Sequence, residues 1–172
     1  MKSVEIYTDG ACSYNPGPGG WCAILLYKKG ENCHEKCVSG GEAVTTNNRM
    51  ELTAVIEGLK QLKTRCKVAL YSDSAYVVNA FNENWIGKWK INGWKKSVNS
   101  KEDIKNRDLW EALYKEVSAH EVEFVKVKGH SDVDYNNRCD EVARSEILKF
   151  APLDPKINEE RGFEVDSETD PD

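Results

Sequence analysis

The sequence predicts an α/β fold in which a five-stranded mixed sheet is flanked by helices. Two kinds of segment alternate along the chain. In some, apolar residues recur at every second position or form a continuous run, as in strands, and in others they recur with the helical period. The first three strand segments follow one another through short connections, whereas each of the last two comes after a helical segment. We therefore expect three antiparallel strands, to which the later strands are added through parallel crossovers.

The first three strands lie in the N-terminal part of the chain. Residues 4–10 (VEIYTDG) alternate apolar and polar side chains, as a half-buried strand does. Residues 21–29 (WCAILLYKK) form a more continuous apolar run, and residues 33–41 (CHEKCVSGG) are typical of an edge strand that ends in glycines. Between the first two strands, residues 9–20 (DGACSYNPGPGG) predict a rigid loop, because they combine prolines with glycines.

Helical period begins after Asn47 and Asn48, where apolar residues from Leu52 to Leu62 recur at steps of three and four. The remaining predicted elements, in chain order, are a strand at 67–74, a short helix at 74–82, a helix from about 104 to 120 with one apolar stripe, a strand at 121–127 and a helix at 136–150.

Charge is distributed unevenly along the 172 residues, whose net charge is -5. Residues 151–172 hold eight acidic and two basic side chains, so residues 1–150 carry +1. We expect one domain at 1–150 and an acidic, disordered or loosely docked tail at 151–172. No apolar run approaches the roughly 18 residues of a membrane span, and we expect a cytoplasmic monomer without membrane contact.

The six cysteines are expected to be free thiols, because a cytoplasmic protein occupies a reducing compartment. The alternative is a zinc site at Cys33, His34 and Cys37. No second ligand pair follows at the spacing of a zinc finger, so we favour thiols in or beside a strand.

Four carboxylates are predicted near the ends of secondary-structure elements. Asp9 and Asp73 each end a strand, and they emerge side by side if those strands are parallel neighbours. Glu51 and Asp140 fall in the first turn or so of their helices. Taken singly, such acids are ordinary turn or helix-dipole residues. Together they would raise one another's pKa unless cations compensated, and all-oxygen ligands select hard ions such as Mg²⁺ or Mn²⁺.

Five motifs surround these acids in order: TDGAC with NPGPGG, TTNNRMEL, SDSAYV, GWKK and VKGHSDVDYNNRCDEVA. Together they resemble type 1 ribonuclease H over roughly residues 3–148. The resemblance implies a ribonuclease H-like fold and Mg²⁺-dependent cleavage of the RNA strand of an RNA–DNA hybrid, which leaves 5′-phosphate and 3′-hydroxyl ends. It assigns metal binding to Asp9, Glu51, Asp73 and Asp140, and a catalytic-loop role to His130.

The chemistry of these residues agrees with the resemblance. Two metal ions about 3.5–4 Å apart activate water on one side of a phosphate and stabilise the leaving oxygen on the other. We expect two Mg²⁺ ions, with Mn²⁺ as a substitute, bridged by Asp9, which the rigid loop behind it would hold in place. The imidazole of His130 would assist proton movement or product release. The alternative is a loop histidine that is hydrogen-bonded to a neighbour.

The resemblance also implies contacts to the RNA strand, which proteins distinguish from DNA chiefly by its 2′-hydroxyl groups. The residues assigned to this strand are Cys12, Asn15, Asn47 and Glu51. For Asn47 and Asn48, capping of the following helix is the alternative.

Contacts to the DNA strand are expected from two regions. Residues 84–96 (NWIGKWKINGWKK) contain tryptophans and lysines but no acid, and they resemble a basic protrusion at about 84–101. The residues assigned to contact there are Trp85, Lys88, Lys95 and Lys96. An amphipathic core helix that includes Trp85 and Trp89 is the alternative. Thr46 and Asn106 match a phosphate pocket on the same strand.

One departure concerns Ala75, which stands where bacterial relatives often carry glutamine, so one minor-groove interaction is expected to be missing. No auxiliary hybrid-binding domain precedes Met1, so we expect low processivity. Two rival functions remain: a non-catalytic hybrid- or duplex-binding module, which replacement of any of the four acids would favour, and a nuclease for structured DNA junctions. The basic protrusion and His130 speak against the second.

Overall fold

The computed structural model describes residues 1–128 and 134–150. Its elements are β1 (Lys2–Cys12), β2 (Gly17–Lys29), β3 (Asn32–Thr45), α1 (Asn47–Lys60), β4 (Cys66–Ser72), α2 (Ala75–Asn82), α3 (Trp85–Ile91), α4 (Arg107–Ser118), β5 (Glu121–Lys126) and α5 (Asp134–Leu148). The predicted order of strands and helices is confirmed, with α3 as an additional helix in the tryptophan-rich segment.

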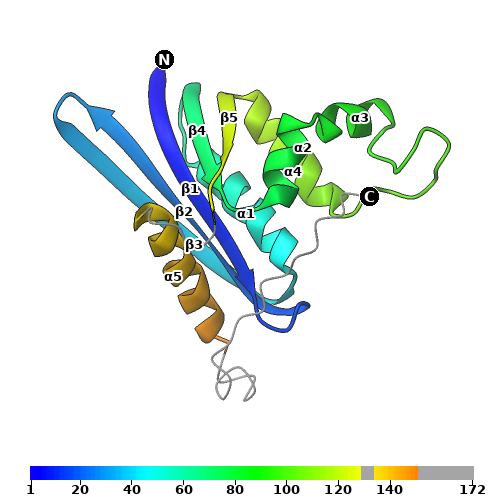
Figure 1. Cartoon of the computed structure of the whole chain (residues 1–172), viewed down its shortest axis with the longest axis horizontal. Coiled ribbons are helices and arrows are strands. Elements are labelled where there is room, and N and C mark those ends of the chain that lie inside the picture. Colours follow the sequence, from blue (N-terminus) through cyan, green and yellow to red (C-terminus); the bar gives the residue numbers. More distant parts are fainter. Residues whose placement is uncertain (129–133, 151–172) are drawn as a thin grey trace.

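The five strands form one mixed sheet in the order β3-β2-β1-β4-β5 (Figure 1). β1 pairs with β2 and β2 with β3 in antiparallel fashion, whereas β1–β4 and β4–β5 are parallel pairs. This topology confirms the predicted architecture of three antiparallel strands extended by parallel crossovers.

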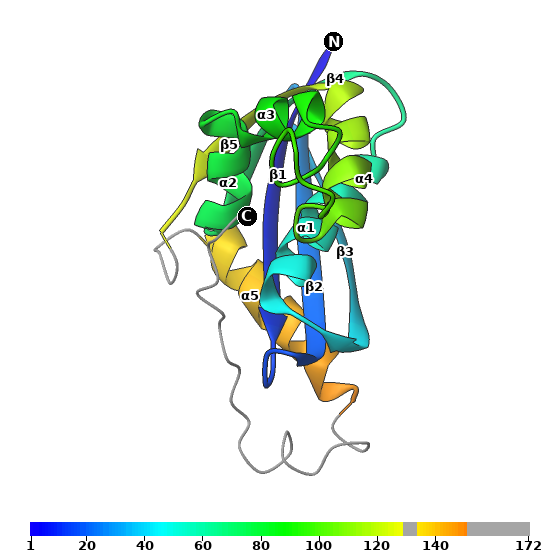
Figure 2. The same ribbon diagram turned by 90° about the vertical axis from the view of Figure 1, so that its right-hand side faces the viewer.

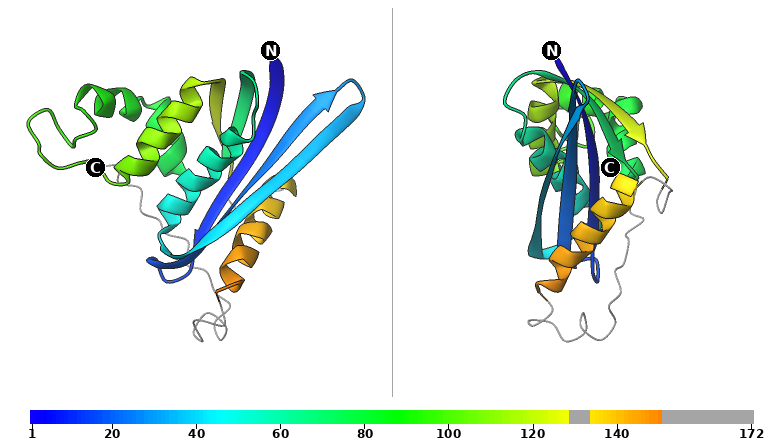
Figure 3. Two further views of the ribbon diagram at one scale, coloured as in Figure 1. Left: turned by 180° about the vertical axis from the view of Figure 1, so that it is seen from behind. Right: turned by 90° about the vertical axis from the view of Figure 1, so that its left-hand side faces the viewer.

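Helices cover both faces of the sheet, with α5 on one face and α1 with α4 on the other (Figures 2 and 3). Alternation along the strands produces two separate cores, because successive side chains point to opposite faces. Ile6 and Leu70 belong to the core beneath α1, α2 and α4, which includes Trp110. Ile24 belongs to the core beneath α5, which includes Ile147.

The connection between β1 and β2 differs from the prediction of a rigid loop over residues 9–20. β1 continues to Cys12 and β2 begins at Gly17, so most of this segment is paired strand. The glycines there allow other elements to approach. A Cβ atom on Gly20 would lie 2.0 Å from the carbonyl oxygen of Ala143 in α5. Close packing of α5 on β2 therefore explains this glycine better than loop geometry does.

The acidic tail at 151–172 and the histidine His130 lie outside the described residues. All six cysteines are reduced thiols, as expected. None of the helices within residues 1–128 and 134–150 is long and apolar enough to cross a membrane.

Candidate active site

Asp9 and Asp73 meet where the parallel pairing of β1 and β4 stops. The last paired residues are Tyr7 and Tyr71, and each aspartate follows two positions later. The prediction that the two aspartates lie on neighbouring parallel strands is confirmed. The prediction that Asp9 ends its strand is wrong, because β1 continues past it and pairs Asp9 with Cys22 of β2. Asp9 is therefore held by strand pairing on β2, and the residue is 4% exposed.

Glu51 reaches the site from α1, which lies directly above β1. The N-cap of this helix is Thr46, and the first turn of α1 contains no acidic residue. Glu51 therefore lies in the second turn, so the first-turn prediction is wrong and a helix-dipole role is excluded. The amide of Gly10 donates hydrogen bonds to Oδ1 of Asp9 and to Oε1 of Glu51, both at 2.9 Å.

The three carboxylates of Asp9, Glu51 and Asp73 form a compact cluster. One ligand oxygen from each lies within 4.8 Å of the other two. Burial raises the pKa of Asp9 and of Glu51 well above the usual range, and the negative charges of the neighbouring carboxylates raise both pKa values further. Oε2 of Glu51 is buried and has no hydrogen-bond partner among the described residues. Such an arrangement suits a divalent cation, which would give this oxygen a partner and offset the repulsion.

Asp140 lies in α5, seven residues into the helix, and not in its first turn as predicted. It is half-buried, and Oδ2 lies 3.6 Å from Nε of Arg144 one turn later. The charge of Asp140 contributes to the raised pKa of Asp9, which places the two carboxylates near one another. Asp140 is not part of the three-residue cluster. We expect a bound cation to draw it closer, because the charge of a cation would outweigh its exposed ion pair with Arg144.

The residues assigned to the RNA strand gather between the β1–β2 connection and the start of α1. Oδ1 of Asn15 accepts a hydrogen bond of 2.9 Å from the amide of Asn47. Thr46 caps α1, so the capping alternative for Asn47 is wrong. The Cys12 thiol is fully buried and donates to the carbonyl oxygen of Thr45 at 3.3 Å. The whole residue is 0% exposed, so the backbone of Cys12 is covered as well and its assignment to the RNA strand stays a prediction.

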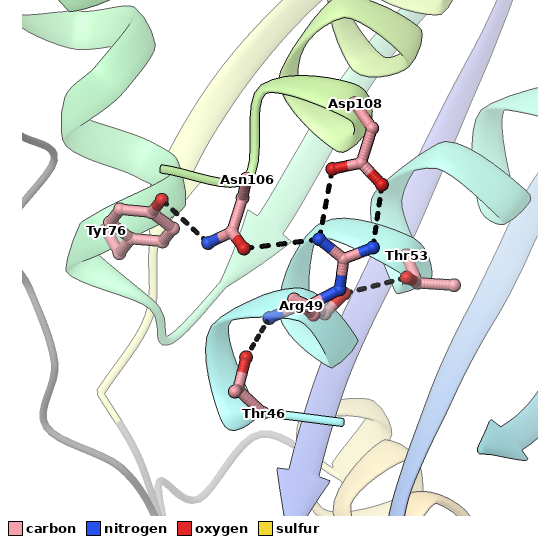
Figure 4. A network of polar contacts seen from close by, with 6 residues as sticks. All are labelled: Thr46, Arg49, Thr53, Tyr76, Asn106 and Asp108. Atoms are coloured by element: carbon pink, nitrogen blue, oxygen red, sulfur yellow. Dashed lines mark hydrogen bonds and ion pairs between the residues drawn. The ribbon is translucent and has the colours of Figure 1, made fainter. Parts of the chain in front are cut away.

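The residues assigned to the phosphate pocket are joined by an arginine that the sequence reasoning missed (Figure 4). Nη1 of Arg49 donates to Oδ1 of Asn106 at 3.3 Å, and the backbone amide of Arg49 donates to Oγ1 of Thr46 at 3.2 Å. A two-pronged ion pair with Asp108, at 3.0 and 2.7 Å, orients the guanidinium. Its place in TTNNRMEL, one turn after Thr46, was the signal in the sequence.

Asn106 is positioned by a second contact, on the side away from Arg49. Its Nδ2 donates to the hydroxyl of Tyr76 at 3.2 Å, and the same hydroxyl accepts from Nε1 of the buried Trp110 at 2.9 Å. Asn106 also has a left-handed backbone, with φ of 60° at the N-cap of α4. Helices α1, α2 and α4 thus jointly orient the Arg49 network (Thr46, Arg49, Tyr76, Asn106 and Asp108).

The lysines of the predicted protrusion have acidic partners that the stretch 84–96 does not contain. Lys95 pairs with Asp103, and Nζ of Lys96 lies 3.4 Å from Oε2 of Glu102. Lys88 is exposed. A single β-bridge between Lys95 and Asp103 brings the acidic segment back onto the basic one. The protrusion is therefore less basic than its sequence indicates.

Two tryptophans of this segment contribute to the core, as the structural alternative predicted. Trp89 is 5% exposed and belongs to the core beneath α1. Trp85 is half-buried and packs against that core, with its ring centroid 6.2 Å from that of Trp89.

The sequence pattern and the fold of this chain recur in known proteins. The RNase H family model matches residues 1–148. A ribonuclease H of Caldicellulosiruptor saccharolyticus is 62% identical over 150 residues, which are 87% of this chain and 99% of that protein.

Two solved structures share the fold. LC9-RNase H1, described as a type 1 RNase H with the type 2 active-site motif, has a TM-score of 0.77 and 28% identity over 87% of this chain and 74% of that one. LC11-RNase H1, solved in complex with an RNA/DNA hybrid, has a TM-score of 0.58 and 22% identity over 85% of this chain and 97% of that one. The family match and the similar relative, together with the carboxylate cluster, lead to one conclusion: this chain belongs to the ribonuclease H family of metal-dependent nucleases, which hydrolyse phosphodiester bonds.

Proposed function

We propose that this protein is an endonuclease that hydrolyses the RNA strand of RNA–DNA hybrids with two Mg²⁺ ions and leaves 5′-phosphate and 3′-hydroxyl ends. The observation that carries the proposal is the cluster of Asp9, Glu51 and Asp73, whose ligand oxygens lie within 4.8 Å of one another. Asp9 and Glu51 are buried and Asp73 is half-buried, and a protein retains carboxylates at such distances when a cation offsets their repulsion.

The donor set of the cluster supports a hard divalent ion. All of its ligands are carboxylate oxygens, which suit Mg²⁺ and allow Mn²⁺ as a substitute. Asp9, Glu51 and Asp73, together with Asp140, would hold the two ions. When bound, the metal supplies an activated water and stabilises the charge that develops on the leaving oxygen.

The protein itself contributes the precise placement of the ligands. Pairing with β2 on one side holds Asp9, and the amide of Gly10 orients both Asp9 and Glu51. Such preorganisation means that the ligands do not have to rearrange during the reaction. His130, which lies outside the described residues, is proposed to assist proton movement or product release.

Binding of the hybrid is proposed to use two groups of residues that meet at the start of α1. The linked Asn15 and Asn47, with backbone groups near Cys12, would contact the RNA strand. The Arg49 network would bind a phosphate of the DNA strand, because Nε and one NH2 proton of Arg49 are not used by the hydrogen bonds within the network. The complex of LC11-RNase H1 with an RNA/DNA hybrid supports this class of substrate.

The basic protrusion is proposed as the third contact region, through Trp85 and Lys88. Lys95 and Lys96 would contribute after their ion pairs with acidic side chains break. We propose that residues 1–150 form the catalytic domain and that the protein acts as a monomer in the cytoplasm.

The decisive experiment compares end-labelled RNA in a hybrid, in duplex RNA and as a single strand, each with Mg²⁺ and with EDTA. We expect cleavage of the hybrid alone, in the presence of Mg²⁺ alone, with 3′ ends that a polymerase can extend. Hybrid binding without cleavage in Mg²⁺ or in Mn²⁺ would contradict the proposal and favour a binding module. Preferential cleavage of branched DNA would favour a junction nuclease.

A further inference from the structure

A pair of thiols lies outside the carboxylate cluster, on the sheet face that α5 covers. The Sγ atoms of Cys22 and Cys37 are 3.6 Å apart. The two residues belong to neighbouring strands, where Cys22 is paired with Ser39 and Cys37 with Ile24, so they are diagonal neighbours on the same face. Neither the proposed hydrolysis nor the packing of α5 requires thiols at both of these positions.

We propose that Cys22 and Cys37 are a redox-modification site, at which a small-molecule disulfide such as oxidised glutathione converts the two thiols to an intramolecular disulfide. The sulfur atoms need to approach by only about 1.5 Å to reach the S–S bond length of about 2.05 Å. Cys37 is exposed, whereas Cys22 is fully buried, so the reagent reaches Cys37 first.

The reaction proceeds in two exchange steps that balance. The Cys37 sulfur, after losing its proton, attacks the small-molecule disulfide, forms a mixed disulfide and releases one glutathione thiol. The Cys22 sulfur then attacks the sulfur of Cys37, which closes the Cys22–Cys37 bond and releases the second glutathione thiol. Two protein thiols are oxidised and one external disulfide is reduced to two thiols. The second step is intramolecular, so proximity favours it.

The surroundings of the thiols set the rate of this reaction. Partial burial and the neighbouring Cys22 raise the pKa of Cys37 to about 12. Because the thiolate is the attacking species, alkaline pH should speed the first exchange step, the attack by Cys37.

Formation of the disulfide is coupled to the carboxylate cluster through strand pairing. Diagonal neighbours on adjacent strands are about 7–8 Å apart, and the Cα atoms of a disulfide are at most about 6.8 Å apart. The backbone of β2 or β3 therefore has to move when the bond forms. Cys22 is the cross-strand partner of Asp9, so a movement of β2 displaces Asp9. The expected loss of cleavage rests on the proposed function, whereas formation of the bond does not.

The test treats the full chain with excess oxidised glutathione at mildly alkaline pH and follows three readouts. We expect two fewer titratable thiols, a Cys22–Cys37 crosslink in non-reduced peptide mapping and a decrease in hybrid cleavage of about tenfold, because a misplacement of about 1 Å at an active site costs up to about 100-fold. Dithiothreitol should restore both the thiols and the cleavage.

Two variants separate this pair from the other thiols. Cys37→Ser should abolish the crosslink and the loss of cleavage. Cys33→Ser is the matched control, because Cys33 is exposed on the same strand, and it should respond as the wild type does. Unchanged thiols after prolonged treatment, a glutathione adduct that persists on Cys37, or a crosslink between other cysteines would overturn the proposal. A Cys22–Cys37 crosslink with full cleavage would overturn the coupling to Asp9. If the untreated protein does not cleave the hybrid, the proposed function fails and the crosslink still decides the redox proposal.

Discussion

The amide of Gly10 in β1 donates a hydrogen bond to Oε1 of Glu51 in α1 across 41 positions of sequence, at 2.9 Å. This contact requires α1 to lie against the strand more closely than a side chain would allow. A Cβ atom on Gly10 would lie 2.4 Å from the amide nitrogen of Glu51 and 2.5 Å from the carbonyl carbon of Met50. The absence of a side chain at Gly10 is therefore what brings Glu51 to the other carboxylates.

Gly10→Ala should push α1 away from β1 and separate Glu51 from Asp9. We expect a loss of about 3 kcal/mol in the free energy of unfolding, as in other overpacked cores, and a decrease in cleavage of about 100-fold or more. Urea denaturation and hybrid cleavage measure the two effects. Gly30→Ala is the control, because φ is +63° there and no atom lies within 4 Å of the added Cβ. It should cost about 1 kcal/mol and leave cleavage intact.

Asp73→Asn keeps the shape of the side chain and removes one charge from the cluster. Hybrid binding should persist while cleavage falls by several orders of magnitude, because one metal ligand is removed. In EDTA the melting temperature should rise, since the charge of Asp73 raises the pKa of Asp9 and Glu51. Mg²⁺ should raise the melting temperature of the variant less than it raises that of the wild type. A variant that cleaves at more than about a tenth of the wild-type rate would contradict the assignment of Asp73 as a ligand.

In the absence of metal, the contribution of the carboxylate cluster to the free energy of unfolding should decrease as pH rises. Raised carboxyl pKa values mean that the folded state binds more protons than the unfolded chain. The contribution of Asp9 and Glu51 is therefore fully present below the ordinary carboxyl pKa of about 4 and is lost as pH rises through the raised values. Mg²⁺ should stabilise the protein more at alkaline than at acidic pH, because it replaces these protons.

The measurement is the urea midpoint in EDTA over a pH series, for the wild type and for Glu51→Gln. Burial lowers the pKa of His120, so this histidine contributes a pH dependence of the opposite sign and is present in both proteins. The difference between the two proteins isolates the cluster. If the difference in urea midpoint between the two proteins does not depend on pH, ionisation of the buried carboxylates does not destabilise the folded state, and the prediction is contradicted.

The protrusion should respond in opposite directions to changes in its lysines and its acids. Replacing Lys88, Lys95 and Lys96 by alanine should weaken hybrid binding and flatten the salt dependence by up to about 0.9 for each phosphate that is no longer neutralised. Asp103→Asn should strengthen binding and steepen the dependence, because it releases Lys95. Titrations of hybrid binding at several salt concentrations measure both slopes. Equal slopes in all variants would show that these side chains do not contact phosphate.

Arg49→Lys should raise KM about tenfold with little change in kcat, because an ammonium cannot reproduce the planar fork that contacts both Asn106 and Asp108. Steady-state cleavage of the hybrid measures this split. Arg138→Lys is the matched control, since Arg138 forms a comparable ion pair with Glu35 on the sheet face opposite α1. A fall in kcat without a change in KM would contradict a binding role for Arg49.

The strand and helix order of this chain followed from local pattern. Alternation in residues such as Val4 and Ile6 and helical spacing from Leu52 onward are properties of short segments, and a helix between two strands favours a parallel crossover. The motifs around Asp9, Glu51 and Asp73 likewise identified the three carboxylates that the fold brings together. Element boundaries are less predictable from local pattern. The glycines near Gly20 are typical of a loop, whereas the contact that requires Gly20 involves Ala143 of α5, far along the chain.

Only the tertiary structure decided which charged groups face one another. The bond between Gly10 and Glu51 and the anchoring of Arg49 by Asp108 join segments that are far apart in the sequence and whose local patterns are independent. Such contacts depend on strand register and on how closely two elements pack. Both are set by the sum of many weak interactions over the whole core, so no short window of sequence contains them.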